Sequence, residues 1–176
     1  MELVTGGSGS GKSAYSEQEI AQGNHGGSLL YIATMYPVGK ETLGKIERHR
    51  ELRAHRHFTT IECYTNLSTA ADRIGREYQE PAVLLECISN LVANELYMDS
   101  GAKEDTVKSV LQGVTQLKEH CKKLVIVTNE VNAEGPATTP EMRRYKQVLG
   151  ELNQHLGAMA DRITEVVYGI PVEVKR

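Results

Sequence analysis

The sequence predicts an α/β fold in which a mostly parallel sheet lies between layers of helices. Two observations carry this prediction. Short apolar runs bounded by turn signals alternate with segments of helical periodicity, as expected when crossover helices join parallel strands. The first apolar run, Leu3–Thr5, passes into a glycine-rich turn and then a helix. We expect one domain over residues 1–176, because the length suits a single core and no linker or repeat interrupts it.

The remaining strands are expected in six places. Three of them are continuous apolar runs, typical of strands buried on both faces of a parallel sheet: residues 28–34, 81–87 and 124–130. Residues 58–62 resemble a short strand. Residues 163–168 and 172–174 are expected to close the sheet around the turn signal Gly169-Ile170-Pro171.

Helices are expected where apolar residues recur every three or four positions, over residues 14–22, 65–78, 88–97, 105–122 and 141–161. Residues 42–56 are also expected to be helical, although this segment is heavily charged. The helix over 105–122 has a stripe that we expect in the core: Val107, Val110, Leu111, Val114 and Leu117. Asn90 and Asn94 share one face of the helix over 88–97.

The turn after the first strand matches the pattern Gly-x-x-x-x-Gly-Lys-Ser, a phosphate-binding loop. The residues involved are Gly6, Gly7, Ser8, Gly9, Ser10, Gly11, Lys12 and Ser13. Glycines leave backbone N–H groups free to converge on phosphate oxygens, Lys12 can reach the β- and γ-phosphates, and the Ser13 hydroxyl can bind Mg²⁺. A flexible Gly/Ser turn is the alternative. With the strand and helix around it, the pattern predicts a nucleoside triphosphate site in a P-loop NTPase (RecA-like) three-layer fold.

Polar residues at strand ends complete the expected site, because open α/β sheets bind ligands beyond the carboxyl ends of their strands. Thr34, Met35 and Tyr36 follow one buried strand. Glu86 ends another, where a phosphate-loop enzyme places a carboxylate near the metal. Glu86 can hold Mg²⁺ directly or through water, or bind the base or ribose; a solvent-facing carboxylate is the alternative.

Five basic side chains and three histidines lie between Lys45 and His57, in a chain whose net charge is -3. Next to a phosphate loop, this segment predicts an anion-binding surface. The alternative is a helix with ordinary solvated charge.

Composition excludes several classes of protein. A pI near 6.1 gives no electrostatic reason to expect a nucleic-acid partner. Cys63, Cys87 and Cys121 are too widely spaced for a zinc site or a disulfide framework, so we expect reduced core thiols. No apolar run approaches the 18 residues of a membrane span, and the early phosphate loop leaves no room for a signal peptide, so we expect a cytoplasmic protein.

Along nearly its whole length the sequence resembles the bifunctional adenosylcobinamide kinase/adenosylcobinamide-phosphate guanylyltransferase family of cobalamin biosynthesis. The matching segments are Thr5–Ser13, Tyr31–Thr34, the basic stretch Ile46–Arg53, Thr60–Glu62, Leu85–Cys87, Val127–Val131, Asn153-Gln154, Ala160-Asp161 and Gly169–Pro171. The phosphate loop is shared by many enzymes. The basic His helix and the Thr-Asn-Glu-Val segment in register with it are far more specific.

The resemblance implies two reactions and assigns residues to them. The first phosphorylates adenosylcobinamide from ATP or GTP. The second moves GMP from GTP onto that phosphate through a guanylylated histidine, which His49 matches. Family nucleotide contacts fall on the loop, on Thr34, Met35, Tyr36, Arg50, Glu51, Leu52, Arg53, Glu62 and Glu86, with Mg²⁺ at Ser13 and Glu86. Lys12 is implied as a catalytic residue, and a homo-oligomer, a trimer, is implied as the assembly.

The chain departs from the family pattern in two segments. Ala54 and Phe58 replace the usual residues after the basic helix, which leaves His55 and His57 as rivals to His49 as nucleophile. The loop at 132–136 also lacks the usual pattern, and this places the corrinoid contacts there in question. Two other functions stay open at this point: a generic phosphate-loop kinase or NTPase, and a nucleotide-gated regulator. The sequence also leaves open whether His49 acts in its own subunit or in a neighbour's.

Overall fold

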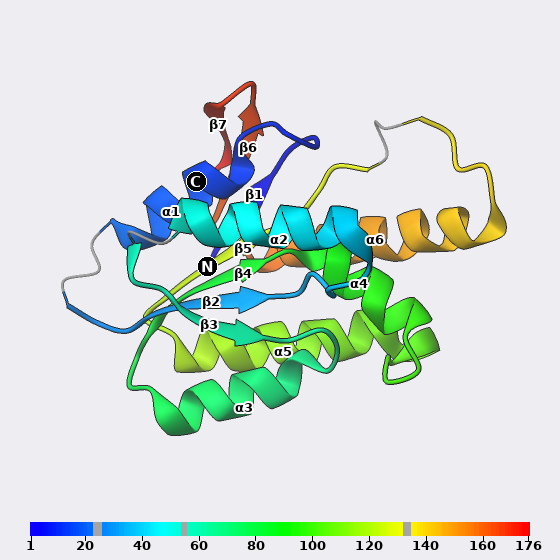
Figure 1. Ribbon diagram of the computed structural model, residues 1–176. Helices are drawn as coiled ribbons and strands as arrows, with labels where there is room; N and C mark the ends of the chain where they lie inside the picture. The colour runs from blue at the N-terminus through cyan, green and yellow to red at the C-terminus, as the bar shows by residue number, and fades with distance from the viewer. Residues whose placement is uncertain (23–25, 54–55, 132–134) are drawn as a thin grey trace.

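A computed structural model of the chain describes residues 1–22, 26–53, 56–131 and 135–176 (Figure 1). Its strands are β1 (Glu2–Thr5), β2 (Leu29–Ala33), β3 (Thr59–Glu62), β4 (Ala82–Glu86), β5 (Lys123–Val127), β6 (Arg162–Val167) and β7 (Ile170–Lys175). Its α-helices are α1 (Lys12–Ala21), α2 (Gly39–Arg53), α3 (Leu67–Glu77), α4 (Ile88–Tyr97), α5 (Thr106–His120) and α6 (Pro140–Met159). A 3₁₀ turn, Lys103–Asp105, precedes α5.

The strands form one seven-stranded sheet in the order β3-β2-β4-β5-β1-β6-β7. Every neighbouring pair is parallel except β6 and β7, which form an antiparallel hairpin. This confirms the predicted mostly parallel α/β fold. Because six strands run in one direction, their carboxyl ends meet at one edge of the sheet, where the phosphate loop also lies.

The strands bury side chains on both faces, which explains their continuous apolar runs. In β4, Val83 and Leu85 belong to one core cluster, whereas Ala82 and Leu84 belong to another on the opposite face. The first cluster is larger and includes residues of α3, α4, α5 and α6. The predicted stripe of α5 lies in it, either buried or partly buried. The second cluster lies under α1.

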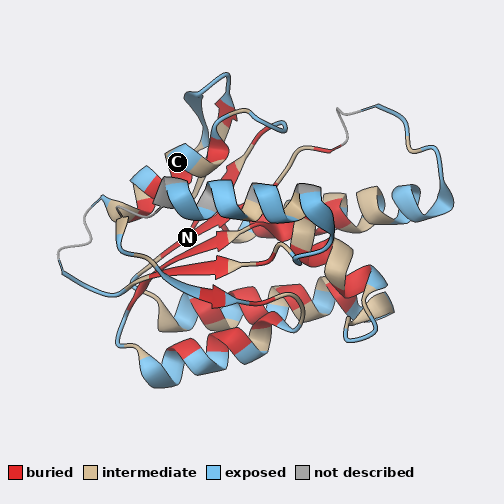
Figure 2. Ribbon diagram, in the orientation of Figure 1, coloured by how far each residue is buried: buried red, intermediate tan, exposed pale blue. Residues whose placement is uncertain are grey.

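Helix α2 differs from the other helices in how little of it is buried. It crosses above the sheet on the same side as α1, and its surface is largely exposed (Figures 1 and 2). Its mean hydropathy is low and it shows no strong apolar face, as expected for a charged segment. Burial of its described side chains therefore contributes little to holding α2 in place.

The closing hairpin corrects one sequence prediction. Gly169-Ile170-Pro171 was expected to form the turn, but the turn is Tyr168-Gly169 and β7 begins at Ile170. Tyr168 and Gly169 have φ values of 50° and 79°, as a two-residue type I′ turn requires. Pro171 is tolerated within the strand because β7 is an edge strand with one unpaired side. The helix over 42–56 also starts earlier than expected, at Gly39.

Other features agree with expectation within the described part of the chain. Cys63, Cys87 and Cys121 are free thiols, two of them buried. Burial raises the pKa of Cys63 to about 11 and of Cys121 to about 12, so both remain protonated near neutral pH. Among the described residues, no helix combines the length and the apolar character needed to cross a bilayer.

The contact between α3 and α5 allows a stability test. A Cβ on Gly113 would lie 2.6 Å from the Leu67 Cβ, whereas a Cβ on Gly157 in α6 would meet only Ile163 Cδ1 at 3.6 Å. We expect Gly113→Ala to lower the free energy of unfolding by about 1–3 kcal/mol through overpacking. Gly157→Ala should instead raise it by about 0.5–1 kcal/mol through helix propensity. Urea unfolding measures both, and equal stability of the two variants would contradict this account.

Candidate functional site

The phosphate loop joins β1 to α1 and depends on glycine at its two ends. Gly6 and Gly11 have φ values of 145° and 97°, which L side chains rarely adopt. A Cβ on Gly6 would lie 2.5 Å from the Val166 carbonyl oxygen, and one on Gly11 would lie 3.2 Å from Gly169 Cα. The loop then opens directly into α1, whose first N–H groups have no carbonyl partner within the helix. Such donors, together with the helix dipole, suit an anion, and the sequence predicts a phosphate at this position.

Lys12 lies within this loop. Its ammonium donates to the Gly7 carbonyl oxygen at 2.6 Å, and the residue is only 7% exposed. The positive charge of Lys12 is therefore kept inside the loop. If a phosphate bound there, its oxygens would replace the Gly7 carbonyl oxygen as the partner of the ammonium group.

Ser13 and Glu86 meet although they are far apart in sequence. The Ser13 hydroxyl donates to Glu86 Oε1. Glu86 Oε2 is buried, and no hydrogen-bond partner for it lies in the described residues. A hydroxyl beside a carboxylate with an unused oxygen is a ligand set that suits a hard divalent cation such as Mg²⁺. The contact joins the two predicted metal ligands and fits that ion.

The residues after β2 lie beside the site in different ways. The Thr34 side chain is buried, where its hydroxyl donates to the Cys87 carbonyl at 2.8 Å and accepts from the Cys87 N–H at 2.7 Å. Met35 lines a cavity of about 160 Å³. The Tyr36 ring packs edge-on against that of Tyr64, with centroids 5.1 Å apart. Thr34 thus joins β2 to the end of β4, and Tyr36 is the more accessible of the three.

The cavity lies between α2 and the ends of β2, β3 and β4. Most of its lining is apolar, and its charged members are Arg50, Glu62 and Glu86. It therefore connects the predicted metal ligand Glu86 with Glu62 at the end of β3. A pocket that is apolar with a few converging polar groups is typical of small-molecule sites.

Glu62 is engaged from two sides. Arg50 Nη2 lies 3.3 Å from Glu62 Oε1, and the Tyr64 hydroxyl donates to Glu62 Oε2 at 2.9 Å. Both members of the Arg50–Glu62 pair are about half exposed, so the pair contributes no more than about 1 kcal/mol. Burial, followed by the hydrogen bond and charge of Glu62, raises the pKa of Tyr64 to about 12. Sequence reasoning missed Tyr64, which no motif marks.

The structure describes only some of the other residues predicted on and after α2. Glu51 is exposed on the helix. The backbone of α2 includes positions 49, 52 and 53, but the side chains of His49, Leu52 and Arg53 lie outside the described part of the structure, as does all of His55. His57, the other rival, is exposed. The divergent loop at 132–134 is likewise not described.

A polar network joins the ends of β2 and β5 to α4 and α6. The Asn129 amide donates to the Ser89 hydroxyl at 2.8 Å, and the Thr128 hydroxyl donates to Asn153 Oδ1 at 2.7 Å. Asn94 donates to the Thr34 carbonyl at 2.8 Å. The partner of the end of β5 in α6 could not be identified from the sequence.

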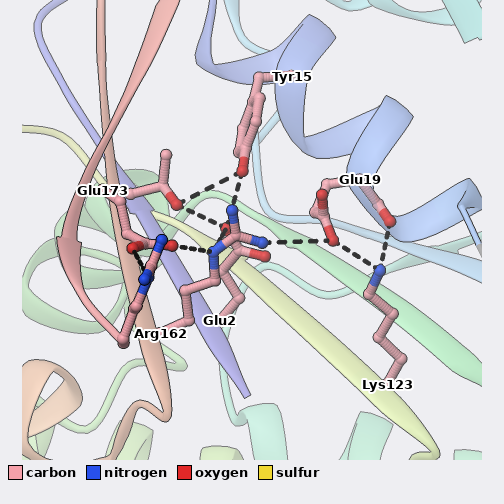
Figure 3. A network of polar contacts seen from close by, with 8 residues as sticks. Glu2, Tyr15, Glu19, Lys123, Arg162 and Glu173 are labelled. Carbon is pink, nitrogen blue, oxygen red and sulfur yellow. Dashed lines mark hydrogen bonds and ion pairs between the residues drawn. The ribbon is translucent and has the colours of Figure 1, made fainter.

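A second network holds α1, and hence the loop, against the sheet. Figure 3 shows side chains from β1, α1, β5, β6 and β7 converging on one another. The Tyr15 hydroxyl donates to Glu2 Oε1 at 3.1 Å, and the Thr164 hydroxyl donates to the same oxygen at 2.8 Å. Arg162 lies 3.9 Å from both Glu2 and Glu19. Burial raises the pKa of Tyr15, so the hydroxyl stays protonated and remains a donor.

A glycine-rich loop between β1 and α1, with a buried lysine inside it and a serine that contacts a strand-end carboxylate, defines a P-loop protein of the nucleotide-binding class. Residues 2–174 match the family model described as cobinamide kinase / cobinamide phosphate guanyltransferase. The chain belongs to this family. It is 35% identical to the bifunctional adenosylcobalamin biosynthesis protein CobU of Salmonella typhimurium, over 99% of each chain. It is 35% identical to CobU of Escherichia coli and 28% identical to CobP of Pseudomonas aeruginosa, over 99% of this chain in both cases.

Family membership confirms the resemblance drawn from the sequence. It makes the chain a transferase and favours the bifunctional prediction over a generic phosphate-loop kinase or a regulator. The roles of individual site residues stay predictions.

The Glu62–Tyr64 contact allows a titration test. With a pKa of about 12, about nine-tenths of Tyr64 is protonated at pH 11. Glu62→Gln removes the charge that opposes phenolate formation, so we expect the Tyr64 pKa to fall toward its ordinary value. NMR titration of ¹³C-labelled tyrosine, with Tyr64→Phe to assign the signal, measures the change. An unaltered Tyr64 pKa in Glu62→Gln would show that the two groups do not interact.

Proposed function

We propose that this chain catalyses two successive reactions at one nucleotide site. The first transfers the γ-phosphoryl group of a nucleoside triphosphate, ATP or GTP, to the hydroxyl of adenosylcobinamide. The second transfers GMP from GTP to adenosylcobinamide phosphate, which gives adenosylcobinamide-GDP. The observation that carries the proposal is the phosphate loop with its Ser13–Glu86 contact, in a chain that matches the family over residues 2–174.

His49 is the proposed nucleophile of the second reaction. A neutral imidazole nitrogen attacks the α-phosphorus of GTP, the N–P bond forms, and the bond to the bridging oxygen breaks as pyrophosphate leaves. A phosphate oxygen of adenosylcobinamide phosphate then attacks the same phosphorus and releases the imidazole. His49 belongs to α2, one turn beyond Ile46, which lines the cavity, and next to Arg50. A protonated His49 has no lone pair for the attack.

Charge accumulates on phosphoryl oxygens in both reactions, and basic residues are available to stabilise it. We assign this role to Lys12 at the loop and to Arg50 and Arg53 on α2. Arg50 is held by Glu62 in a solvent-exposed pair, so a nucleotide can displace that contact at little energetic expense.

Ser13 and Glu86 are the residues proposed to hold Mg²⁺. When bound, this ion neutralises charge on the β- and γ-phosphate oxygens and orients them. The buried, unused Glu86 Oε2 supports this assignment. Among the described residues there is no cluster of three or more Asp, Glu, His or Cys side chains placed to bind a metal. The proposed ion would take its remaining ligands from phosphate oxygens and water.

The cavity under α2 is proposed to receive the nucleotide base. Its apolar lining suits a planar ring, and the Glu62 carboxylate can accept two hydrogen bonds from adjacent N–H groups such as those of guanine. Thr34, Met35, Tyr36 and the segment from Arg50 to Arg53 then border the nucleotide between the loop and the cavity.

The nucleophile assignment can be tested with GTP labelled on the α-phosphate, in the presence of Mg²⁺. We expect an acid-labile covalent label on the wild type, its complete loss in His49→Ala, and retention of some kinase activity in that variant. His57→Ala is the matched control and should keep the label. Lys12→Ala should lower both activities by at least about tenfold, because it removes a charge-assisted hydrogen bond to phosphate.

Three results would contradict parts of this proposal. Label on His49→Ala at the wild-type level would exclude His49 as the nucleophile. Loss of the label in His57→Ala alone would assign the role to His57. No covalent label on the wild type, with γ-phosphoryl transfer intact, would leave a phosphate-loop kinase without the second reaction.

We also propose that the chain forms a homo-oligomer, a trimer, through the β6–β7 hairpin. Of the ten large apolar residues exposed in the described structure, five lie between Val167 and Val174. Ile170, Val172 and Val174 alternate along β7 and share one face. A contiguous exposed apolar surface of this kind is typical of protein interfaces. Pro171 has no N–H to offer at the sheet edge, so contact through side chains is favoured over strand addition.

The assembly is tested by Val172→Glu. Burying an unpaired carboxylate in the interface should raise the dissociation constant between subunits by at least about tenfold. Light scattering coupled to size-exclusion chromatography measures it. Met142→Glu places the same charge at a similarly exposed site on α6 and should not change the mass. A wild type that is monomeric at high concentration would refute the proposal.

A further inference from the structure

The turn between β6 and β7 rests directly on the phosphate loop. The Gly169 N–H donates to the Ser10 carbonyl oxygen at 2.8 Å. Because Tyr168 and Gly169 both have positive φ, as in a type I′ turn, the backbone directs this N–H away from the hairpin ladder. The turn therefore uses one of its two unpaired donors to hold a loop carbonyl.

Packing reinforces this contact along the loop. Gly11 is so close to the turn that an added Cβ would lie 3.2 Å from Gly169 Cα. Gly6, at the other end of the loop, approaches the Val166 carbonyl oxygen in the same way. Two of the loop glycines therefore face the hairpin, and the space that the hairpin occupies contributes to the requirement for glycine at those positions.

Peptide geometry gives the contact a consequence for ligand binding. In a trans peptide unit the C=O and the following N–H point in opposite directions. When Gly169 holds the Ser10 carbonyl on the hairpin side, the Gly11 N–H must point to the other side, away from the hairpin and into the loop. Glycine imposes little barrier to rotation of this unit, so an external contact is needed to keep one orientation.

We propose that Gly169 is a positioning residue for nucleotide binding, which acts by orienting the Ser10–Gly11 peptide so that its N–H faces the phosphate. The inference rests on the proposed nucleotide site. It adds to that site a contribution from the C-terminal hairpin, outside the phosphate-loop pattern.

The hairpin is suited to this role because β6, which leads into its turn, packs against the same part of the core as α1, the helix that follows the loop. Val166 is 1% exposed and packs in the core under α1. Thr164, two residues earlier, shares the Glu2 carboxylate with Tyr15 of α1. The strand that leads into the turn and the helix that follows the loop are therefore bound to the same carboxylate.

Lengthening the turn tests the proposal. Two glycines inserted between Tyr168 and Gly169 carry the donor away from Ser10 while β6 and β7 can still pair. We expect the Kd for GTP and the KM for the triphosphate to rise about tenfold, the worth of one hydrogen bond, while kcat changes less than about twofold. The Gly11 amide signal in an NMR spectrum should also lose the shift that it shows in the wild type when GTP is added.

Tyr168→Asn is the matched control. Asn-Gly is a strongly favoured type I′ sequence, so this variant keeps both the turn and the donor and should bind GTP as the wild type does. Size-exclusion chromatography and thermal unfolding confirm that the variants compared share one assembly and one fold. Should the insertion prevent folding, an ester in place of the Tyr168–Gly169 peptide bond removes only the N–H and is expected to produce the same rise in Kd.

The results separate this inference from the proposed nucleotide site. Wild-type affinity in the lengthened or ester variant, with binding lost in Lys12→Ala, would overturn the role of Gly169 and leave the site intact. Wild-type affinity in Lys12→Ala would instead refute the phosphate site itself, and the positioning role with it. A tenfold higher Kd for GTP in the lengthened variant, together with the wild-type Kd in Tyr168→Asn, supports the proposal.

Discussion

The site depends on one constraint on the backbone. The loop that joins β1 to α1 has to turn in the limited space beside β6 and its hairpin. Between Gly6 and Gly11 the chain has to leave the sheet edge and open its N–H groups on one side. It does so with positive φ at both of those residues, while carbonyls of the hairpin and the hairpin turn occupy the other side. A side chain at either position would meet backbone, so the composition of the loop follows from its surroundings as much as from the anion it is expected to bind.

Anchoring this turn requires charge as well as shape. Glu2 is buried at the start of β1, where it accepts from Tyr15 and Thr164 and lies near Arg162. A buried carboxylate is tolerated only when it is paired and hydrogen-bonded. Because its partners come from α1 and β6, satisfying Glu2 also fixes the helix that follows the loop. The polar network around Glu2 lies at the end of the sheet opposite the site. It nevertheless helps to position the loop, because it fixes α1.

Sequence reasoning predicted those parts of the molecule that local pattern encodes. Apolar runs and helical periodicity identified each strand and each α-helix in the described part of the chain, and the spacing from Gly6 to Ser13 identified the loop. The meeting of Ser13 with Glu86 followed from the rule that parallel strands end at one edge. The predicted position of the turn in the last hairpin was wrong. Gly-Ile-Pro is a turn signal, and the sequence does not indicate that Pro171 lies in an edge strand, where proline is tolerated.

What the sequence could not supply are contacts set by tertiary packing. Arg50 reaches Glu62 because β3 ends beside α2, and Gly169 reaches Ser10 because β6 pairs with β1. Neither pair has a spacing that any local rule would recognise. The partners of Asn129 and Asn153 are of the same kind. Such contacts decide how a site is held, whereas the motif alone indicates the kind of ligand.

The order of strands explains how one nucleotide site can serve two reactions under the proposed function. The loop follows β1, the hairpin lies beyond it on one side, and β4, β2 and β3 lie on the other, under α2. A nucleotide that reaches from the loop to the cavity near Glu62 has its terminal phosphates at the loop and its α-phosphate on the α2 side. An acceptor hydroxyl can then approach the γ-phosphorus at the loop, while the helix that contains His49 borders the α-phosphorus. The two nucleophiles approach different positions along a triphosphate bound in one orientation. After the diphosphate product of the first reaction leaves, the GTP of the second reaction can therefore bind in the same way as the first triphosphate.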